Sequence, residues 1–304
     1  MRVATTSHYA QAVKNLQDQA SQIGTLQTQI SSELRVNKPS DDPVAAAQAE
    51  RIRARQAKLE ADQRMIDHAK GMLQQADSAV GSASDELQHA RELLLTASAP
   101  AFTDADRASL AEELSGTLGN LIAIANQSDG NGGYVFGGAG TDRSPFTTSG
   151  SIVYQTQTGQ QSVATDPALA TTQDGEDAFI AIPQADGGTR SVFDAISAAI
   201  DALQDTALSD TDRMAAIDST IDSVDASFDR LSFIRTRIGE SLKIVDSQTS
   251  LAESTSITLQ SRLSDLVDLD YTKALTEMTS SQVAYQAAMQ TYAAVSRMSL
   301  FQYL

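Results

Sequence analysis

The clearest hydrophobic pattern in the chain is a seven-residue repeat between residues 52 and 97. Large apolar residues fill one position of the repeat, at Ile52, Leu59, Ile66, Leu73, Val80, Leu87 and Leu94. Alanine fills the second, at Ala69, Ala76, Ala83, Ala90 and Ala97. A repeat of this length is typical of a closely packed, coiled-coil-like helix. Asp42 is suited to cap this helix, Pro43 to its first turn, and Pro100 to its end.

A second, shorter helix is predicted from Thr103 to Gly130. Thr103 is a favourable N-cap residue, and glycine is common where a helix stops. One face of this helix is apolar, with Leu110, Leu114, Leu121 and Ile124.

A longer apolar seam runs through the last third of the chain. Spacings of three and four connect Met214, Ile217, Ile221, Val224, Phe228, Leu231, Ile238, Leu242 and Val245, with Arg235 as the charged exception, and the phase continues through Ala252, Leu259, Leu263 and Leu266. Asp270 then falls where an apolar residue is expected. A new seam follows at Tyr271, Met278, Tyr285 and Tyr292, with Ala274, Ala288 and Val295 between. Such a slip indicates a joint or a change of packing partner.

The N-terminal segment has a seam of its own, and its remaining surface is unusual. The seam is Tyr9, Val13, Leu16, Ala20, Ile23, Ile30 and Leu34. Lys14 and Asp18 are the only charges between residues 3 and 32, and Arg297 is the only one between 278 and 304. An exposed helix normally has a charged face. Other copies of the protein could surround these ends, or the ends could be weakly amphipathic tails that become ordered only on assembly.

Residues 131–190 differ from the helical parts. Residues 151–154 and 178–182 are expected to form short strands, because they are apolar and are bounded by Gly, Thr, Asp and Pro. The residues therefore predict a mainly α fold with a small β-rich insert. Helices from both chain ends would pair in an elongated, antiparallel coiled coil or bundle.

Composition narrows the function. The chain has no Cys, and its net charge is −17, with 20 acidic and 5 basic residues between 101 and 230. This acidity argues against a nucleic-acid binder. No apolar run is long enough to cross a membrane, and the start lacks the apolar core of a cleavable signal peptide.

Signals for catalysis or metal binding are weak. The loop that starts at Asp129 resembles a calcium loop, but Tyr134 stands where such a loop needs glycine. The chain contains no nucleotide-binding, zinc-protease or serine-hydrolase motif. Asp41 and Asp42 are better explained as helix-start residues than as an acid–base pair. We expect no catalytic residue, no metal site, no cofactor and no enzyme activity.

Four segments resemble the flagellin superfamily, and within it the hook–filament junction proteins of the FlgL type. Residues 35–46 resemble the segment R-x-x-x-P-S-D-D-P-x-A-A, and residues 133–146 resemble G-x-x-x-F-x-G followed by P-F. Residues 264–271 resemble a D-x-D-Y joint, and residues 299–304 resemble the ending S-L-F-x-Y-L. Filament flagellin shares the terminal seams, but it usually lacks the P-S-D-D-P form and this ending.

The resemblance implies three domains. Residues 1–40 with 267–304 would form a terminal coiled coil, residues 41–132 with 187–266 a helical bundle, and residues 133–186 an outer β-rich domain. It also implies export through the flagellar type III channel to the cell exterior, without a cleaved signal. The implied partners are other copies in a ring, the other junction protein, flagellin and an export chaperone, with neither nucleic acid nor membrane.

The implied role is a structural adaptor between hook and filament, and it gives roles to specific residues. The expected assembly interface comprises Tyr9, Val13, Leu16, Ile23, Ile30, Leu34, Tyr271, Met278, Tyr285, Tyr292, Val295, Phe301 and Leu304. The expected helix-start and joint residues are Pro39, Ser40, Asp41, Asp42, Pro43, Asp268 and Asp270. Two alternatives remain: a flagellin-like filament subunit, and a secreted enzyme or adhesin on a flagellar stem.

Overall fold

The computed structural model describes residues 2–99, 102–140, 143–147, 151–163, 167–184 and 187–301, with side chains from residue 10 to residue 294. The chain forms two compact units, each packed mainly against itself. Unit 1 comprises Met1–Glu60 and Glu253–Leu304, and unit 2 comprises Ala61–Ala252. These borders differ from the predicted ones at 40/41 and 266/267, and the three-domain division remains a prediction.

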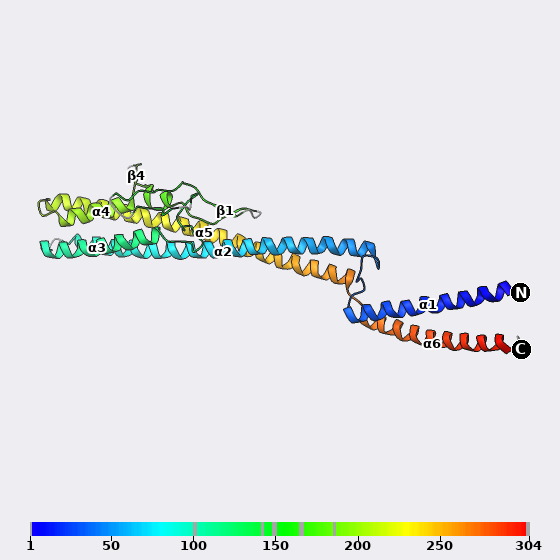
Figure 1. Ribbon diagram of the computed structural model, residues 1–304. Helices are drawn as coiled ribbons and strands as arrows, with labels where there is room; N and C mark the ends of the chain where they lie inside the picture. Colours follow the sequence, from blue (N-terminus) through cyan, green and yellow to red (C-terminus); the bar gives the residue numbers. More distant parts are fainter. Residues whose placement is uncertain are drawn as a thin grey trace. The chain divides into compact units, whose positions relative to one another are not determined.

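In unit 1, helices α1 (Arg2–Ser32) and α6 (Tyr271–Phe301) lie side by side in opposite directions (Figure 1). The residues of α1 that are turned inward are Ala12, Leu16, Gln19, Ile23, Leu26 and Ile30, of which Leu26 is buried. Val13 and Ala20 are exposed, so their predicted place in this seam is wrong. The inward residues are spaced alternately by four and three positions, and they include Leu26, which the sequence pattern did not identify.

The facing side of α6 matches the predicted seam more closely. Ala274 is buried, and Met278, Tyr285, Ala288 and Tyr292 are partly buried. Tyr271 is 54% exposed and therefore lies outside this contact. With few fully buried side chains among residues 10–32 and 271–294, this part of the helix pair gains little hydrophobic stabilisation by itself.

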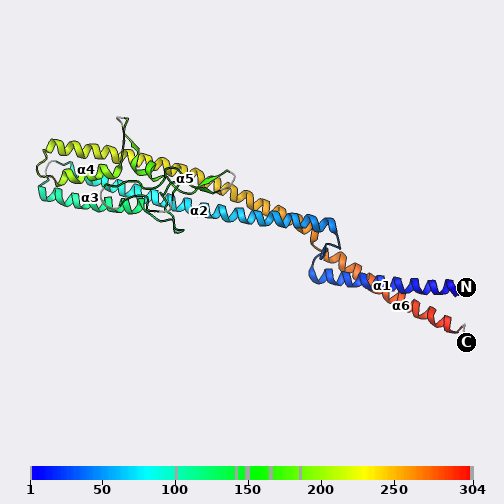
Figure 2. The same cartoon turned by 45° about the horizontal axis from the view of Figure 1, so that its top comes forward.

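Unit 2 is built from parts of α2 (Pro43–Ala97) and α5 (Asp210–Val267) together with α3 (Asp104–Ala125) and α4 (Val192–Gln204), as two views show (Figures 1 and 2). The predicted α2 repeat is confirmed from Ile66 onward, where both seam positions are buried. Thr103 caps α3 in a capping box with Asp106. The predicted end of this helix at Gly130 is wrong, because α3 ends at Ala125 with Asn126 as its cap.

The buried face of α5 repeats every seven residues. It contains Ile217, Val224, Leu231, Ile238, Val245, Ala252 and Leu259. Phe228, which was expected in the seam, is 41% exposed. Small hydroxyl residues take the neighbouring inward positions instead: Thr220 donates to the Ala195 carbonyl at 3.0 Å, and Ser223 donates to Gln184 Oε1 at 3.2 Å. These hydrogen bonds bring α4 and Gln184 close to α5.

The insert contains little β structure. Among its described residues, β1 (Ser162–Val163) pairs antiparallel with β2 (Leu169–Ala170), and β3 (Ile182–Pro183) pairs antiparallel with β4 (Thr189–Arg190). The predicted strand at 178–182 is wrong except at Ile182, which begins β3, because Glu176–Ile180 forms a π-helical turn. Ala178 and Phe179 are both buried, and consecutive side chains of a strand would point to opposite faces. The predicted strand at 151–154 is reduced to one bridge between Phe146 and Tyr154.

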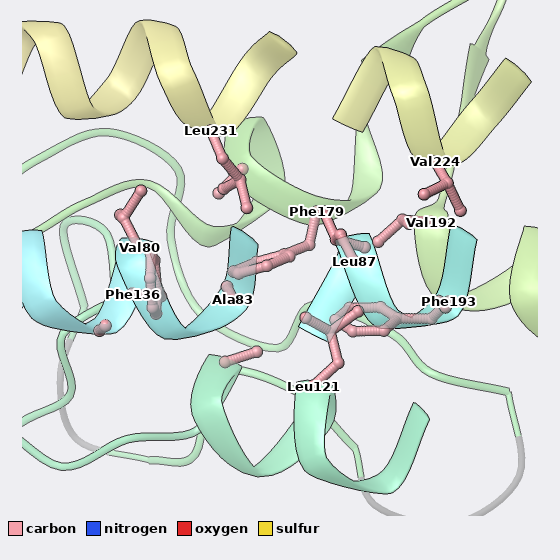
Figure 3. Packing of buried hydrophobic residues seen from close by; sticks show 14 of the residues in the cluster. Val80, Ala83, Leu87, Leu121, Phe136, Phe179, Val192, Phe193, Val224 and Leu231 are labelled. Atoms are coloured by element: carbon pink, nitrogen blue, oxygen red, sulfur yellow. The ribbon is translucent and has the colours of Figure 1, made fainter. Parts of the chain in front are cut away.

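The insert shares its core with the helices of unit 2. Phe136, Phe146 and Phe179 of the insert and Phe193 of α4 are buried, and their rings contact one another at centroid distances of 5.0–5.8 Å. In Figure 3, Val224 and Leu231 project from α5 towards these rings and α2. The fold is therefore mainly α, with small antiparallel sheets packed onto the helices.

Candidate assembly site

Two short segments meet in unit 1 where four helices begin or end. Residues 33–42 connect α1 to α2, and residues 268–270 connect α5 to α6; together we call them the joint. Leu34 and Asp268 form an antiparallel bridge. The Arg35 amide donates to the Val267 carbonyl at 2.7 Å, and the Leu269 amide donates to the Glu33 carbonyl at 3.0 Å. Backbone hydrogen bonds thus tie the two segments together.

Carboxylates of the joint satisfy the free amides at the helix starts. Asp42 Oδ1 accepts from the Ala45 amide at 2.9 Å at the start of α2, where Pro43 is the first residue. Asp270 Oδ1 accepts from the Lys273 amide at 3.0 Å at the start of α6. The Ala45 amide, and after it the Arg35 guanidinium, hold the pKa of Asp42 below its usual range. Both aspartates therefore act as caps.

The turn before α2 is closed by Asp41. Its Oδ2 accepts from the amides of Asn37 at 3.0 Å and Lys38 at 2.8 Å, and its own amide donates to the Lys38 carbonyl. Pro39 and Ser40 lie within this exposed turn. Asp268 closes the other segment by accepting from Ser264 Oγ. The predicted joint residues therefore lie in these two segments or next to them.

Arg35 connects the first segment of the joint to the end of α5, and the sequence pattern did not predict this. One guanidinium nitrogen lies 3.2 Å from Asp42 Oδ2, and another donates to the Leu266 carbonyl. Its own carbonyl accepts from Gln29 Nε2 at 2.8 Å. The sequence did contain a signal for this role, since Arg35 is the first residue of the 35–46 motif that also contains the helix-start aspartates.

A small apolar core lies beneath these polar contacts. It contains Val36, Ala45, Ala49 and Val267, with Leu34, Leu263 and Leu266 packed against it. Glu33 next to it has a φ of 59°, a left-handed conformation that is uncommon for a residue with a side chain. The left-handed residue ends α1 and turns the chain towards this core.

The outer surface of the α1–α6 pair contains apolar side chains that have no cover in the monomer. These are Val13, Leu275, Val283 and Met289, with exposed fractions from 38% to 63%. Around them the exposed residues are mostly Gln, Ser, Thr and Ala, with few charges. The predicted residues Leu16, Ile23, Ile30, Met278, Tyr285 and Tyr292 are partly buried in α1 and α6. The side chains of Tyr9, Val295 and Phe301, and all of Leu304, lie outside the described residues.

Among the residues that the structure describes, the groups with shifted pKa values do not converge on one site. Asp106 has a lowered pKa because Thr103 donates to it, and Lys70 has a raised pKa because it pairs with Asp246. Burial raises the pKa of Tyr154 in the insert. Asp129 Oδ1 accepts from the amides of Asn131 and Gly133, both at 2.8 Å, so the loop itself uses this carboxylate.

Within the described ranges, no group of three His, Cys, Asp or Glu side chains has the arrangement of a metal site. None of the helices there is both long and apolar enough to cross a bilayer.

Family models match both ends of the chain. The bacterial flagellin N-terminal helical region matches residues 3–141, and the bacterial flagellin C-terminal helical region matches residues 221–304. The two matched ranges cover α1 to α3 and most of α5 with α6.

Known proteins give a consistent result. Flagellar hook-associated protein 3 of Escherichia coli is 28% identical over 314 residues, with 99% of each chain covered. Flagellin of Bacillus subtilis is 24% identical over a match that covers 85% of this chain and 84% of the flagellin. The crystal structure of the flagellar junction protein FlgL from Legionella pneumophila superposes with a TM-score of 0.61 at 17% identity, covering 73% of this chain and all of that one.

The family models assign both terminal helical regions to the flagellins. The match to flagellar hook-associated protein 3 over 99% of both chains indicates which kind of flagellin-like protein this is. The chain therefore belongs to the bacterial flagellin superfamily, and within it to the hook-associated proteins of the FlgL type.

Proposed function

We propose that the protein is a structural adaptor subunit at the junction between flagellar hook and filament. The observation that carries this proposal is the α1–α6 pair, which presents uncovered apolar side chains on a surface with few charges. The end-to-end likeness to a flagellar hook-associated protein supports the same role. The resulting function is mechanical, because the surface favours packing against other subunits.

Assembly would complete the burial that the monomer leaves unfinished. Val13, Leu275, Val283 and Met289 are exposed, and burying such a side chain contributes about 1.5–3 kcal/mol. Neighbouring subunits that cover these side chains would order α1 and α6 further. The predicted interface residues between the helices would then act indirectly, because they hold the pair in the conformation that neighbours recognise.

The joint would give this terminal pair a fixed attachment. Its backbone bonds, its two capping aspartates and the Arg35 contacts connect the ends of four helices in unit 1. A force applied to either α1 or α6 would reach α2 and α5 through several hydrogen bonds at once. This property suits a subunit that links two tubes.

The partners follow from the role and from the resemblance. We infer a ring of copies of this chain, placed between the other hook–filament junction protein and flagellin. An export chaperone and passage through the type III channel, without a cleaved signal, belong to the same proposal. The division into a terminal coiled coil, a helical bundle and an outer domain also remains part of it.

Cells that lack the gene test the role. We expect electron microscopy to show hooks without filaments, and an assay of the medium to find shed flagellin monomers. Bare hooks without shed flagellin would favour a filament subunit or an export factor. Normal filaments would overturn the proposal.

Point variants in the deleted strain test the surface. Val283→Asp places a charge on the exposed surface of α6 and should block filament growth while the purified protein keeps its helix content. Gln286→Asp, at another exposed position on α6, is the matched control for the added charge. Tyr285→Asp should also block growth, because it disturbs the α1–α6 contact, while unit 2 stays folded. Normal filament growth with Val283→Asp and Tyr285→Asp would contradict the assigned surface.

A further inference from the structure

A groove in unit 1 has three arginines among the seven residues that line it. Helix α2 contributes Gln48, Arg51, Ile52 and Arg55, and α5 contributes Arg262, Asp265 and Leu266; the volume is about 430 Å³. The α2 residues are spaced by three, four and seven, so they share one face of that helix. We call this feature the arginine groove.

The arginines of the groove are available to a partner. In the described part of the chain, Arg51, Arg55 and Arg262 are exposed and form no ion pair. Asp265 is the only carboxylate that lines the groove. The floor includes Ile52 and Leu266, which are partly buried, and Gln56 donates to Gln260 at 3.1 Å between the same two helices. The groove therefore combines three positive groups with an apolar floor, and a hydrogen bond connects the two helices that form it.

The charge of the chain is divided unequally between its two units. Unit 1 contains 11 basic and 11 acidic residues, and unit 2 contains 11 basic and 28 acidic residues, so unit 2 carries the entire net charge of −17. A second copy of the chain thus offers a strongly acidic surface to an arginine-lined groove. Such complementarity steers association and fixes register.

One helix face in unit 2 carries a row of aspartates. On α5, Asp218, Asp222, Asp225 and Asp229 are all exposed and share one helix face. Asp225 pairs with Arg91 at 2.6 Å. Within the described residues the other three aspartates form no ion pair. We call this row the aspartate ridge.

We propose that the arginine groove of one subunit binds the aspartate ridge of a neighbouring copy of the same chain. The guanidinium groups would form charge-assisted, bidentate hydrogen bonds with the carboxylates, which arginine favours over lysine. Because groove and ridge are different surfaces, the contact is head-to-tail, and it gives a ring where the rotation between successive copies closes. The inference rests on the proposed role in a ring, and it assigns one contact within that ring.

Cross-linking tests the contact directly, because the chain has no cysteine of its own. Gln48→Cys at the groove and Asp222→Cys at the ridge would be combined in one chain, expressed in the deleted strain and treated in isolated flagella with a bismaleimide. We expect a product of twice the subunit mass, with higher multiples. Gln48→Cys combined with Glu112→Cys, on an exposed acidic position of α3, is the control and should give none.

Charge exchange provides a second test. Arg51→Glu with Arg55→Glu should reduce the number of filament-bearing cells, and so should Asp218→Arg with Asp222→Arg. All four changes in one chain should restore filaments, since the exchanged charges face each other in neighbouring copies. Circular dichroism of each purified variant identifies any loss of folding, and the cross-link does not depend on these variants.

The outcomes are distinguishable. Intact filaments without the cross-linked product would overturn this contact and leave the adaptor role in place. Failure of the unmodified chain to restore filaments would instead contradict the proposed function.

Discussion

The amide of Arg35 donates a hydrogen bond to the carbonyl of Val267 at 2.7 Å, and this bond joins the segment after α1 to the end of α5. The side chain of Arg35 adds contacts to Asp42 and to the Leu266 carbonyl. One residue thus connects the first segment of the joint to the end of α5 through both its backbone and its side chain. Nothing in the local sequence requires this pairing, because the partners lie at opposite ends of the chain.

Removal of the Arg35 side chain should loosen the joint. We expect Arg35→Ala to be cleaved faster between residues 33 and 42 in limited proteolysis, because the Asp42 and Leu266 contacts are lost while the backbone bond remains. Lys38→Ala is the control, since Lys38 contributes its backbone to the turn. Equal cleavage rates for both variants would show that the Arg35 side chain does not secure the joint.

The cap at Asp42 should make the start of α2 sensitive to acid. The pKa of Asp42 is lowered in the folded chain, so its stabilising effect is fully present above the ordinary value of about 3.9 and is lost as the pH falls through the folded pKa. Asp42→Asn keeps a capping side chain but removes the charge that pairs with Arg35.

Hydrogen exchange of the Ala45 and Ala46 amides measures this effect. At neutral pH we expect faster exchange in Asp42→Asn than in the unmodified chain. At a pH well below the folded pKa, the two proteins should exchange at the same rate. A difference that persists unchanged into strong acid would contradict the assignment.

Leu26 should be the main apolar contact of α1. It is 7% exposed, and truncation of a buried leucine costs about 2–5 kcal/mol. Leu26→Ala should therefore increase hydrogen exchange along α1 and α6. Val13→Ala, at an exposed position of the same helix, should change stability by less than about 0.5 kcal/mol. If both variants exchange alike, the inward face of α1 is not the one described.

Phe179 should be essential to the core of unit 2. It is fully buried, and its ring contacts Phe136, Phe146 and Phe193. We expect Phe179→Ala to lower the free energy of unfolding by about 3–5 kcal/mol in denaturant titrations. Phe233→Ala is the control, because that ring is half exposed and contacts Arg230 and Arg237 on the surface, which is worth about 0.5–1 kcal/mol.

Two glycine substitutions should have opposite effects on thermal stability. A Cβ at Gly175 would lie 2.6 Å from the Phe136 carbonyl oxygen and 2.7 Å from a Tyr154 ring carbon, so Gly175→Ala should destabilise by about 1–3 kcal/mol. A Cβ at Gly119, on the exposed face of α3, has open space, so Gly119→Ala should stabilise by up to about 1 kcal/mol. A higher melting temperature for Gly175→Ala would mean that the insert packs differently.

Much of the helical architecture could be predicted because its signals are local and periodic. The α2 repeat from Ile66 onward, the Thr103 cap and the break near Asp270 all lie where the pattern indicated. The insert was predicted less well. Its apolar residues, such as Phe179, were assigned to a strand because a short apolar run does not distinguish a strand from a helical turn.

The sequence by itself determined that the chain forms long amphipathic helices at both ends, that the seam breaks near Asp270, and that Asp42 caps the helix after it. These properties depend on residues within a few positions of one another. Only the tertiary structure decided that Val13 and Phe228 face outward, that Leu26 faces inward, and that Arg35 meets Val267. Each of these outcomes depends on which distant segment packs against the helix, because a partner that approaches closely selects small inward residues and turns large ones towards the surface.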